Sequence, residues 1–165
     1  MERLLPEFSE PILDLVKAPP PPSSWVDGKV LAELDDTIFD VYGENVLAST
    51  AHETTKRSLA PILRAVAESW LRLFGTSPRT LLSRLGALSA STVRGVSFGW
   101  RDTDARAGEM LVTYDDSRDV PQSAFVAIGA GLVNIFEMCG TTGTVALGDA
   151  SKHAPRNRAP FVCRW

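Results

Sequence analysis

Cysteine and histidine are scarce in this sequence, which contains only two residues of each type. The cysteines, Cys139 and Cys163, are not spaced as a C-x-x-C pair, and neither belongs to a Cys/His group with zinc-ligand spacing. The sequence therefore predicts no metal site, and we expect both cysteines to be reduced thiols of a cytoplasmic protein. A histidine-based catalytic dyad or triad has only His52 or His153 as its base.

Long apolar runs and an excess of positive charge are also missing. The longest apolar stretch, 125–136, is interrupted by Gly129, Gly131 and Asn134 and is shorter than the roughly 20 residues that span a bilayer. The first residues include several acids, unlike a signal peptide. The net charge of -3 and the pI of about 5.4 argue against nucleic acid as the main partner. We therefore expect a cytoplasmic protein that neither inserts into a membrane nor binds nucleic acid.

The length and composition are those of one globular domain: 165 residues, of which 44% are hydrophobic and 22% charged. Four consecutive prolines, Pro19 to Pro22, cannot continue a helix and favour an extended polyproline conformation. We interpret residues 1–24 as an N-terminal helix followed by a proline-rich linker, and residues 25–165 as a single domain. Recruitment of a proline-reading domain is the alternative role for this run.

Helical periodicity dominates the first half of the domain. Asp27 is suited to cap a helix that ends at Gly43, and the best amphipathic pattern contains Trp70 and Phe74. Helices are expected over 27–43, 44–57, 58–75 and 77–87. Five aromatic side chains are expected to be largely buried: Trp70, Phe74, Phe98, Phe125 and Phe136.

The hydrophobic period changes to two after Ser89, which is typical of β-strands. Residues 121–139 then form a helix that is apolar nearly all around, which indicates burial on most sides. Strands that form two hairpins are expected over 96–101, 109–115, 144–148 and 161–165. The sequence thus predicts an α+β fold, with an N-terminal helical layer packed on a four-stranded antiparallel sheet made of two hairpins joined by a buried helix.

The last third of the sequence carries a resemblance to known families. Gly129 and Gly131 in the buried helix are followed by a strand, by Gly148 and Asp149, and by a closing strand that ends in an aromatic residue. Over about residues 25–165 this pattern resembles a group of α/β domains. The group joins the four-vinyl reductase domain, the haem-NO-binding domain and the bacterial relatives of vesicle-tethering TRAPP subunits.

A narrower resemblance rests on the proline-led Trp25 and the helix end at 70–75, which are similar to a family of small myxobacterial proteins. These resemblances imply a fold and a sensing or tethering role, and they transfer no catalytic residue. Haem-NO sensors need a proximal histidine and a Tyr-x-Ser-x-Arg motif, and this sequence contains no such motif. Residues 150–152 also hold no counterpart of the cysteine that four-vinyl reductase domains often place near the matched turn.

The helix expected over 44–57 contains the candidate ligand-binding residues. If this helix lines a pocket, His52, Glu53 and Thr55 supply the polar groups that orient a ligand in a mainly apolar cavity. The alternative is a solvent-exposed face, which the polar neighbours of His52 favour. We expect no haem and no metal at His52, and no cofactor elsewhere in the chain.

Two surfaces are candidates for protein interaction. The first is an apolar helix stripe suited to self-association, formed by Val30, Leu34, Ile38 and Tyr42. The second is a basic patch suited to an acidic partner, formed by Lys152, Arg156 and Arg158.

These observations favour a non-catalytic protein-interaction or signalling module of a bacterial cytosolic system, acting as a homodimer with a protein partner. The alternative is a small-ligand sensor domain for a hydrophobic molecule or haem. An enzyme ranks third, because no catalytic motif stands out.

Overall fold

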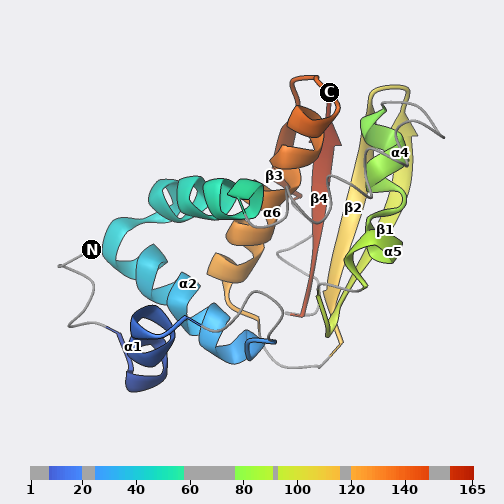
Figure 1. The fold of residues 1–165 in the computed structure, drawn as a ribbon. Coiled ribbons are helices and arrows are strands. Elements are labelled where there is room, and N and C mark those ends of the chain that lie inside the picture. Colours follow the sequence, from blue (N-terminus) through green and yellow to red (C-terminus); the bar gives the residue numbers. More distant parts are fainter. Residues whose placement is uncertain (1–7, 20–24, 58–76, 91–92, 116–119, 149–156) are drawn as a thin grey trace.

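The computed structural model describes residues 8–19, 25–57, 77–90, 93–115, 120–148 and 157–165. The helix expected over 58–75, with Trp70 and Phe74, lies outside these residues, as do Lys152, His153 and Arg156. Within them, helices gather on one side of an antiparallel sheet (Figure 1). No helix in these ranges is long and apolar enough to cross a membrane.

Four antiparallel strands form one sheet in the order β1-β2-β4-β3. They are β1 Val96–Asp104, β2 Ala107–Tyr114, β3 Thr144–Leu147 and β4 Arg158–Arg164. The predicted hairpins pair β1 with β2 and β3 with β4, and they join where Met110 of β2 lies opposite Phe161 of β4. The expected α+β architecture is therefore confirmed, with β4 inside the sheet and the short β3 at one edge.

Helix α6, Gln122–Met138, connects the two hairpins and packs on the sheet, as predicted. Its buried side chains include Phe125, Leu132 and Phe136, and the Phe136 ring stacks on Trp165 with ring centroids 6.2 Å apart. The main hydrophobic core consists of Leu81, Leu82, Met110, Val112, Phe125, Leu132, Ile135, Phe136, Ala159, Phe161 and Cys163. Phe98, which we expected to be largely buried, is only partly buried against this core.

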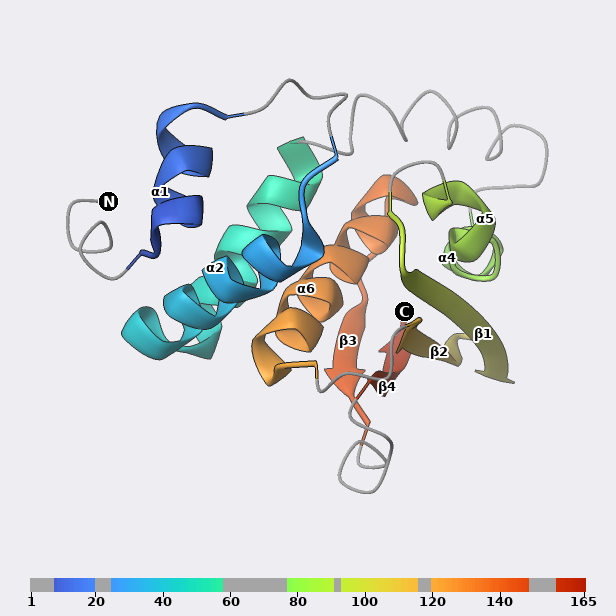
Figure 2. The same cartoon turned by 90° about the horizontal axis from the view of Figure 1, so that it is seen from below.

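Three N-terminal helices form the helical layer: α1 Glu10–Lys17, α2 Gly28–Tyr42, and a helix that begins at residue 44 and is described to residue 57, hereafter helix 44–57. Asp27 caps α2 as predicted, because its carboxylate accepts a hydrogen bond from the Lys29 amide at 2.9 Å. Gly43 ends α2 at a φ of 83°, which favours glycine. Figure 2 shows this layer on the side of α6 away from the sheet, and α2 packs on α6.

A single helix was expected over 77–87, and the structure instead has two short ones, α4 Pro78–Leu82 and α5 Leu85–Ser89. Between them, the Arg84 amide bonds to the Leu81 carbonyl at 3.1 Å, which tightens the chain into a turn. The break lets α4 pack on α6 while α5 packs on β1. There, a Cβ atom on Gly86 would lie only 3.0 Å from the Phe98 carbonyl oxygen, so glycine permits the close approach.

Candidate ligand site

A groove with a cavity volume of about 510 Å³ lies between helix 44–57, α6 and the strands β3 and β4. We call it the α6 groove, because α6 supplies more of its lining than any other element. Its lining residues are Glu44, Ala48, His52, Gln122, Phe125, Val126, Gly129, Ala130, Val133, Glu137, Val145, Leu147 and Phe161. Nine of these are apolar or glycine, and the volume lies in the range of pockets that bind small molecules.

Small residues on α6 bring the walls of the groove close to its floor. A Cβ atom on Gly129 would lie 2.9 Å from Cε1 of Phe161, so the ring packs directly against the helix backbone. A Cβ atom on Gly131 would lie 3.2 Å from Oγ1 of Thr55, so helix 44–57 also approaches α6 closely. The two glycines thus set the spacing of α6 from its neighbours on both sides.

One end of the groove carries a network of charged side chains. Nε2 of His52 lies 3.0 Å from Oε1 of Glu137, and Nζ of Lys56 lies 2.9 Å from Oε2 of the same carboxylate. The hydrogen bond from Lys56 lowers the pKa of Glu137, and the same bond raises the pKa of Lys56. Glu137 therefore stays ionised at neutral pH and holds two side chains of helix 44–57 against the end of α6.

Asn134 attaches the backbone of helix 44–57 to α6. It is a buried polar residue on α6, and its Nδ2 atom donates hydrogen bonds to the carbonyls of His52 at 3.1 Å and Gly131 at 3.3 Å. In the sequence, Asn134 stands out only as an interruption of an apolar run. A polar residue in an otherwise apolar, buried helix is the signal that would have identified it, because such groups need buried partners.

The structure separates the three predicted ligand-binding residues. Only His52 lines the α6 groove. Thr55 packs against Gly131 of α6, and Glu53 lies in a second, shallower depression. The structure therefore does not bring the three residues together at one pocket, and their role in ligand binding stays a prediction.

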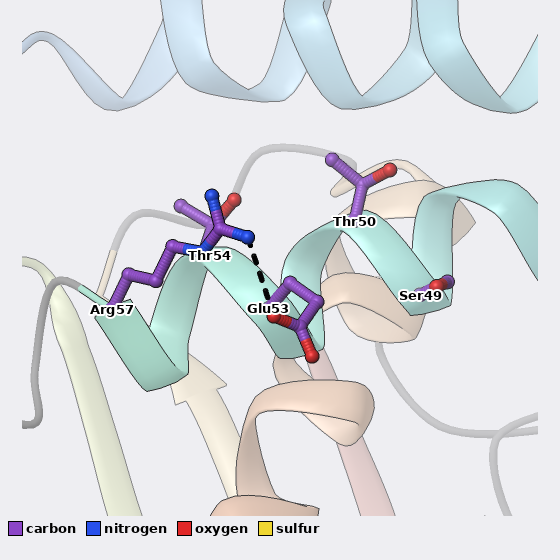
Figure 3. Close-up of a pocket in the computed structure, with 5 residues that line it drawn as sticks. All are labelled: Ser49, Thr50, Glu53, Thr54 and Arg57. Atoms are coloured by element: carbon purple, nitrogen blue, oxygen red, sulfur yellow. Dashed lines mark ion pairs between the residues drawn. The ribbon is translucent and has the colours of Figure 1, made fainter.

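The second depression has a volume of about 300 Å³ and is lined by Ser49, Thr50, Glu53, Thr54 and Arg57 (Figure 3). All five residues come from helix 44–57, and Glu53 and Arg57 form an i,i+4 ion pair with an Oε2–Nη2 distance of 3.8 Å. Among the described residues, no second element closes this polar surface. The α6 groove, with walls from both helices and the sheet, is therefore the stronger candidate site.

The predicted interaction surfaces are only partly described. On α2, the side chains of Val30, Leu34 and Ile38 are half-buried and Tyr42 is exposed. Arg158 begins β4 and is exposed, while Lys152 and Arg156 lie outside the described residues. Self-association and docking of an acidic partner at these surfaces stay predictions.

Two further arginines in the described part of the chain, Arg94 and Arg101, already have partners. Arg94 lies over the Trp25 ring, with its guanidinium carbon 4.0 Å from the centroid, and Arg101 pairs with Glu109 at 3.1 Å. The positive charges of these two arginines are therefore already engaged, and an acidic partner would compete for them. They do not extend the predicted basic patch.

The surroundings of the two cysteines, and of Asp102 in the first hairpin, indicate structural roles. Burial raises the pKa of Cys163 to about 12 and that of Cys139 to about 11, which disfavours the reactive thiolates. Asp102 accepts a hydrogen bond from the Trp100 indole at 2.9 Å and pairs with Arg79 at 3.0 Å. In the described ranges, no group of three or more His, Cys, Asp or Glu side chains is placed to hold a metal ion.

Comparison with known proteins gives a fold relationship. No protein-family model matches this chain, and no curated protein matches it significantly. Among solved structures, an Fe(II) unliganded H-NOX protein from K. algicida is 11% identical with a TM-score of 0.58, over 94% of this chain and 85% of that one. A mutant of that protein gives 10% identity and a TM-score of 0.59, over 99% and 90% of the two chains. A structure concerned with H-NOX activation is 10% identical with a TM-score of 0.53, over 98% of this chain and 90% of that one.

These likenesses show that the chain has the fold of H-NOX, or haem-NO-binding, domains. The predicted resemblance is thus confirmed for the fold of that one member of the group. The resemblances to four-vinyl reductase domains, TRAPP subunits and small myxobacterial proteins stay predictions.

Proposed function

We propose that this protein is a small-ligand sensor domain that binds an apolar molecule in the α6 groove and does not use haem. The observation that carries the proposal is the groove itself, an apolar cavity of about 510 Å³ with polar groups confined to a few positions. Sites of this composition are the usual binding sites for small molecules. The shared fold with H-NOX domains supports a sensing role, which the sequence analysis held as its alternative hypothesis.

Haem does not fit the residues that are present. A haem group needs an axial ligand, which His52 alone offers among the groove residues. Nε2 of His52 lies 3.0 Å from Glu137, and Nδ1 lies 3.8 Å from Glu53, so both ring nitrogens face carboxylates. The groove is also lined by Glu44 and Glu137 and by none of the described Lys or Arg residues, so this part of the chain offers the carboxylates of a haem no cationic partner.

The groove lies where a ligand would change the spacing of two layers. Helix 44–57 and α6 form one wall and the floor, and the sheet forms the other wall. Helix 44–57 is held to α6 by Asn134 and Glu137, both near one end of α6. A ligand that binds one spacing of these layers more tightly shifts the protein toward that spacing, as sensing requires.

A protein partner would receive this signal. Exposed apolar and aromatic side chains suit such a role. Val41, Tyr42 and Val46 lie near Gly43, and Trp25 and Leu31 lie near the start of α2. Cytoplasmic location, a non-catalytic role and homodimer formation are parts of the same proposal.

Fluorescence of the neutral apolar dye Nile red tests the proposal. We expect saturable binding to the full-length protein and at least about tenfold weaker binding to Val133→Trp, because the indole fills the groove. Leu111→Trp is the matched control, since Leu111 is exposed on the opposite face of β2 from Met110 and Val112. Equal loss in both variants, or no loss in Val133→Trp, would contradict the proposal.

The haem-free part of the proposal has its own measurement. Protein incubated with excess haemin and passed through a desalting column should retain no Soret absorbance. A retained Soret band that disappears in His52→Ala would overturn this part and identify His52 as an axial ligand.

A further inference from the structure

We infer that the α6 groove selects a cationic amphiphile, a molecule with an apolar chain and an ammonium head that pairs with Glu44. This inference rests on the proposed ligand-sensing function and adds the chemical class of the ligand. It is based on two features of the same groove. One is the Glu44 carboxylate, which has no ion-pair partner among the described residues, and the other is the apolar floor.

The polar residues of the groove come from both helices. Glu44 is the first residue of helix 44–57, and Gln122 is the first residue of α6. His52 lies about two turns further along its helix, and Glu137 lies about four turns further along α6. The apolar part of the floor lies on α6 between Gln122 and Glu137. It consists of Val126, Gly129, Ala130 and Val133.

The two carboxylates that line the groove differ in their partners. Glu137 is neutralised by Lys56, at 2.9 Å, and also contacts His52. Glu44 has no ion pair within the part of the chain that the structure describes. Among the described residues that line the groove, only Glu44 therefore presents an uncompensated negative charge to a ligand.

The polarity of the groove fits one arrangement of an amphiphile. An ammonium head placed at Glu44 gains a charge-assisted hydrogen bond. The chain then lies along the apolar floor toward Val133. The start of helix 44–57 opposes this preference, but it contributes only about half an elementary charge, less than the full charge of Glu44.

The opposite class, an amphiphile with an acidic head, lacks a partner. None of the described Lys or Arg residues lines the groove, and the amine of Lys56 is already bound to Glu137. A carboxylate head would lie against Glu44 or Glu137, and like charges at this range repel. An amphiphile with a neutral head is not repelled and forms no ion pair. We therefore expect its affinity to lie between those of the cationic and the acidic amphiphile.

Three probes with the same ten-carbon chain test this order: decylammonium, decanol and decanoate. Each is titrated below its aggregation concentration against Nile red bound to the full-length protein at pH 7. We expect decylammonium to displace the dye most strongly, with an affinity about fivefold above that of decanoate, as for a partly exposed ion pair. In Glu44→Gln this ratio should fall to less than about twofold.

Glu33→Gln is the matched control, because it removes the same charge from an exposed position on α2 outside the groove. It should keep the wild-type preference, and circular dichroism should show that both variants are folded. Equal affinities for the three probes, a preference for decanoate, or a preference that survives in Glu44→Gln would overturn the cationic ligand class while leaving the proposed function intact. Failure of all three probes, together with dye binding that is insensitive to Val133→Trp, would overturn both.

Discussion

The amide of Asn134 on α6 donates a hydrogen bond to the backbone carbonyl of His52 at 3.1 Å, across 82 residues of sequence. The bond joins a helix of the N-terminal layer to the helix that crosses the sheet. Because Asn134 is buried, its loss leaves a carbonyl with fewer partners in an apolar setting.

Replacement of Asn134 therefore tests how the two helices are held together. We expect Asn134→Ala to lower the free energy of unfolding by about 1–3 kcal/mol, the usual range for a buried polar group that loses its partner. Asn134→Asp should cost more at pH 7, since an ionised carboxylate cannot donate to the His52 carbonyl. Urea unfolding measures the free energy of unfolding of both variants. An Asn134→Asp variant as stable as wild type would contradict the role of the donated hydrogen bond.

Replacement of His52 should have a small effect by comparison. Its contacts with Glu137 and Glu53 lie at the surface, where ion pairs contribute little. We expect His52→Ala to change the free energy of unfolding by less than about 1 kcal/mol. His52→Gln, which keeps a donor toward Glu137, is the companion variant. A loss well above this limit in both variants would show that the ring supports the fold.

The contribution of Asp35 to the stability of the domain should rise as the pH falls from about 7 to 4. Burial, and then the neighbouring Asp36 carboxylate, raise the pKa of Asp35 in α2 from 3.8 to about 6. Between these two values the folded state holds a proton that the unfolded state has lost, so acidification favours folding. Above pH 6 both states are ionised, and the folded state carries the cost of a half-buried charge.

Asp35→Asn isolates this effect from the other carboxylates. At pH 7.5 we expect the variant to be more stable than wild type by about 1 kcal/mol, a value reduced because water still reaches the side chain. The difference should disappear near pH 4. Asp40→Asn is the control at an exposed position of the same helix. A pH-independent difference for Asp35→Asn would contradict the assigned cause.

The aromatic core should dominate stability. Phe136 is 1% exposed and stacks on Trp165, and Phe125 is 6% exposed with its ring edge toward Tyr114. We expect alanine at either position to cost about 3–5 kcal/mol, enough to threaten a domain of ordinary stability. Leu111→Ala, at an exposed site on β2, should cost less than about 1 kcal/mol. Thermal melting of Phe125→Ala that matches wild type would show this account of the core to be wrong.

Local chemistry was enough to predict most of the elements. Asp27 and Gly43 delimit α2 because capping and left-handed backbone depend on nearby residues alone. The alternation at Val96, Phe98 and Trp100 identifies β1 for the same reason. Local pattern did not reveal the turn between α4 and α5, since their different docking partners, α6 and β1, separate them.

Long-range relationships were beyond the sequence pattern. The pairing of β2 with β4 brings Met110 opposite Phe161, and no periodicity encodes which strands become neighbours. The same limit applied to the site. His52 was recognised as a candidate, but its partner Glu137 lies 85 residues later and carried no motif. The groove arises from where α6 crosses the helical layer, and this geometry is a property of tertiary packing.

The central position of β4 has a consequence for biosynthesis. During translation β1, β2, α6 and β3 are made before residues 158–164, so β3 has no partner strand and one edge of β2 stays open until then. The apolar face of α6 also waits for Phe161, the ring that packs on Gly129. A ribosome-bound chain that stops before β4 therefore exposes strand edges and aromatic surface that invite association or chaperone capture. We expect arrested nascent chains to change from protease-sensitive to protease-resistant only after this strand has left the exit tunnel.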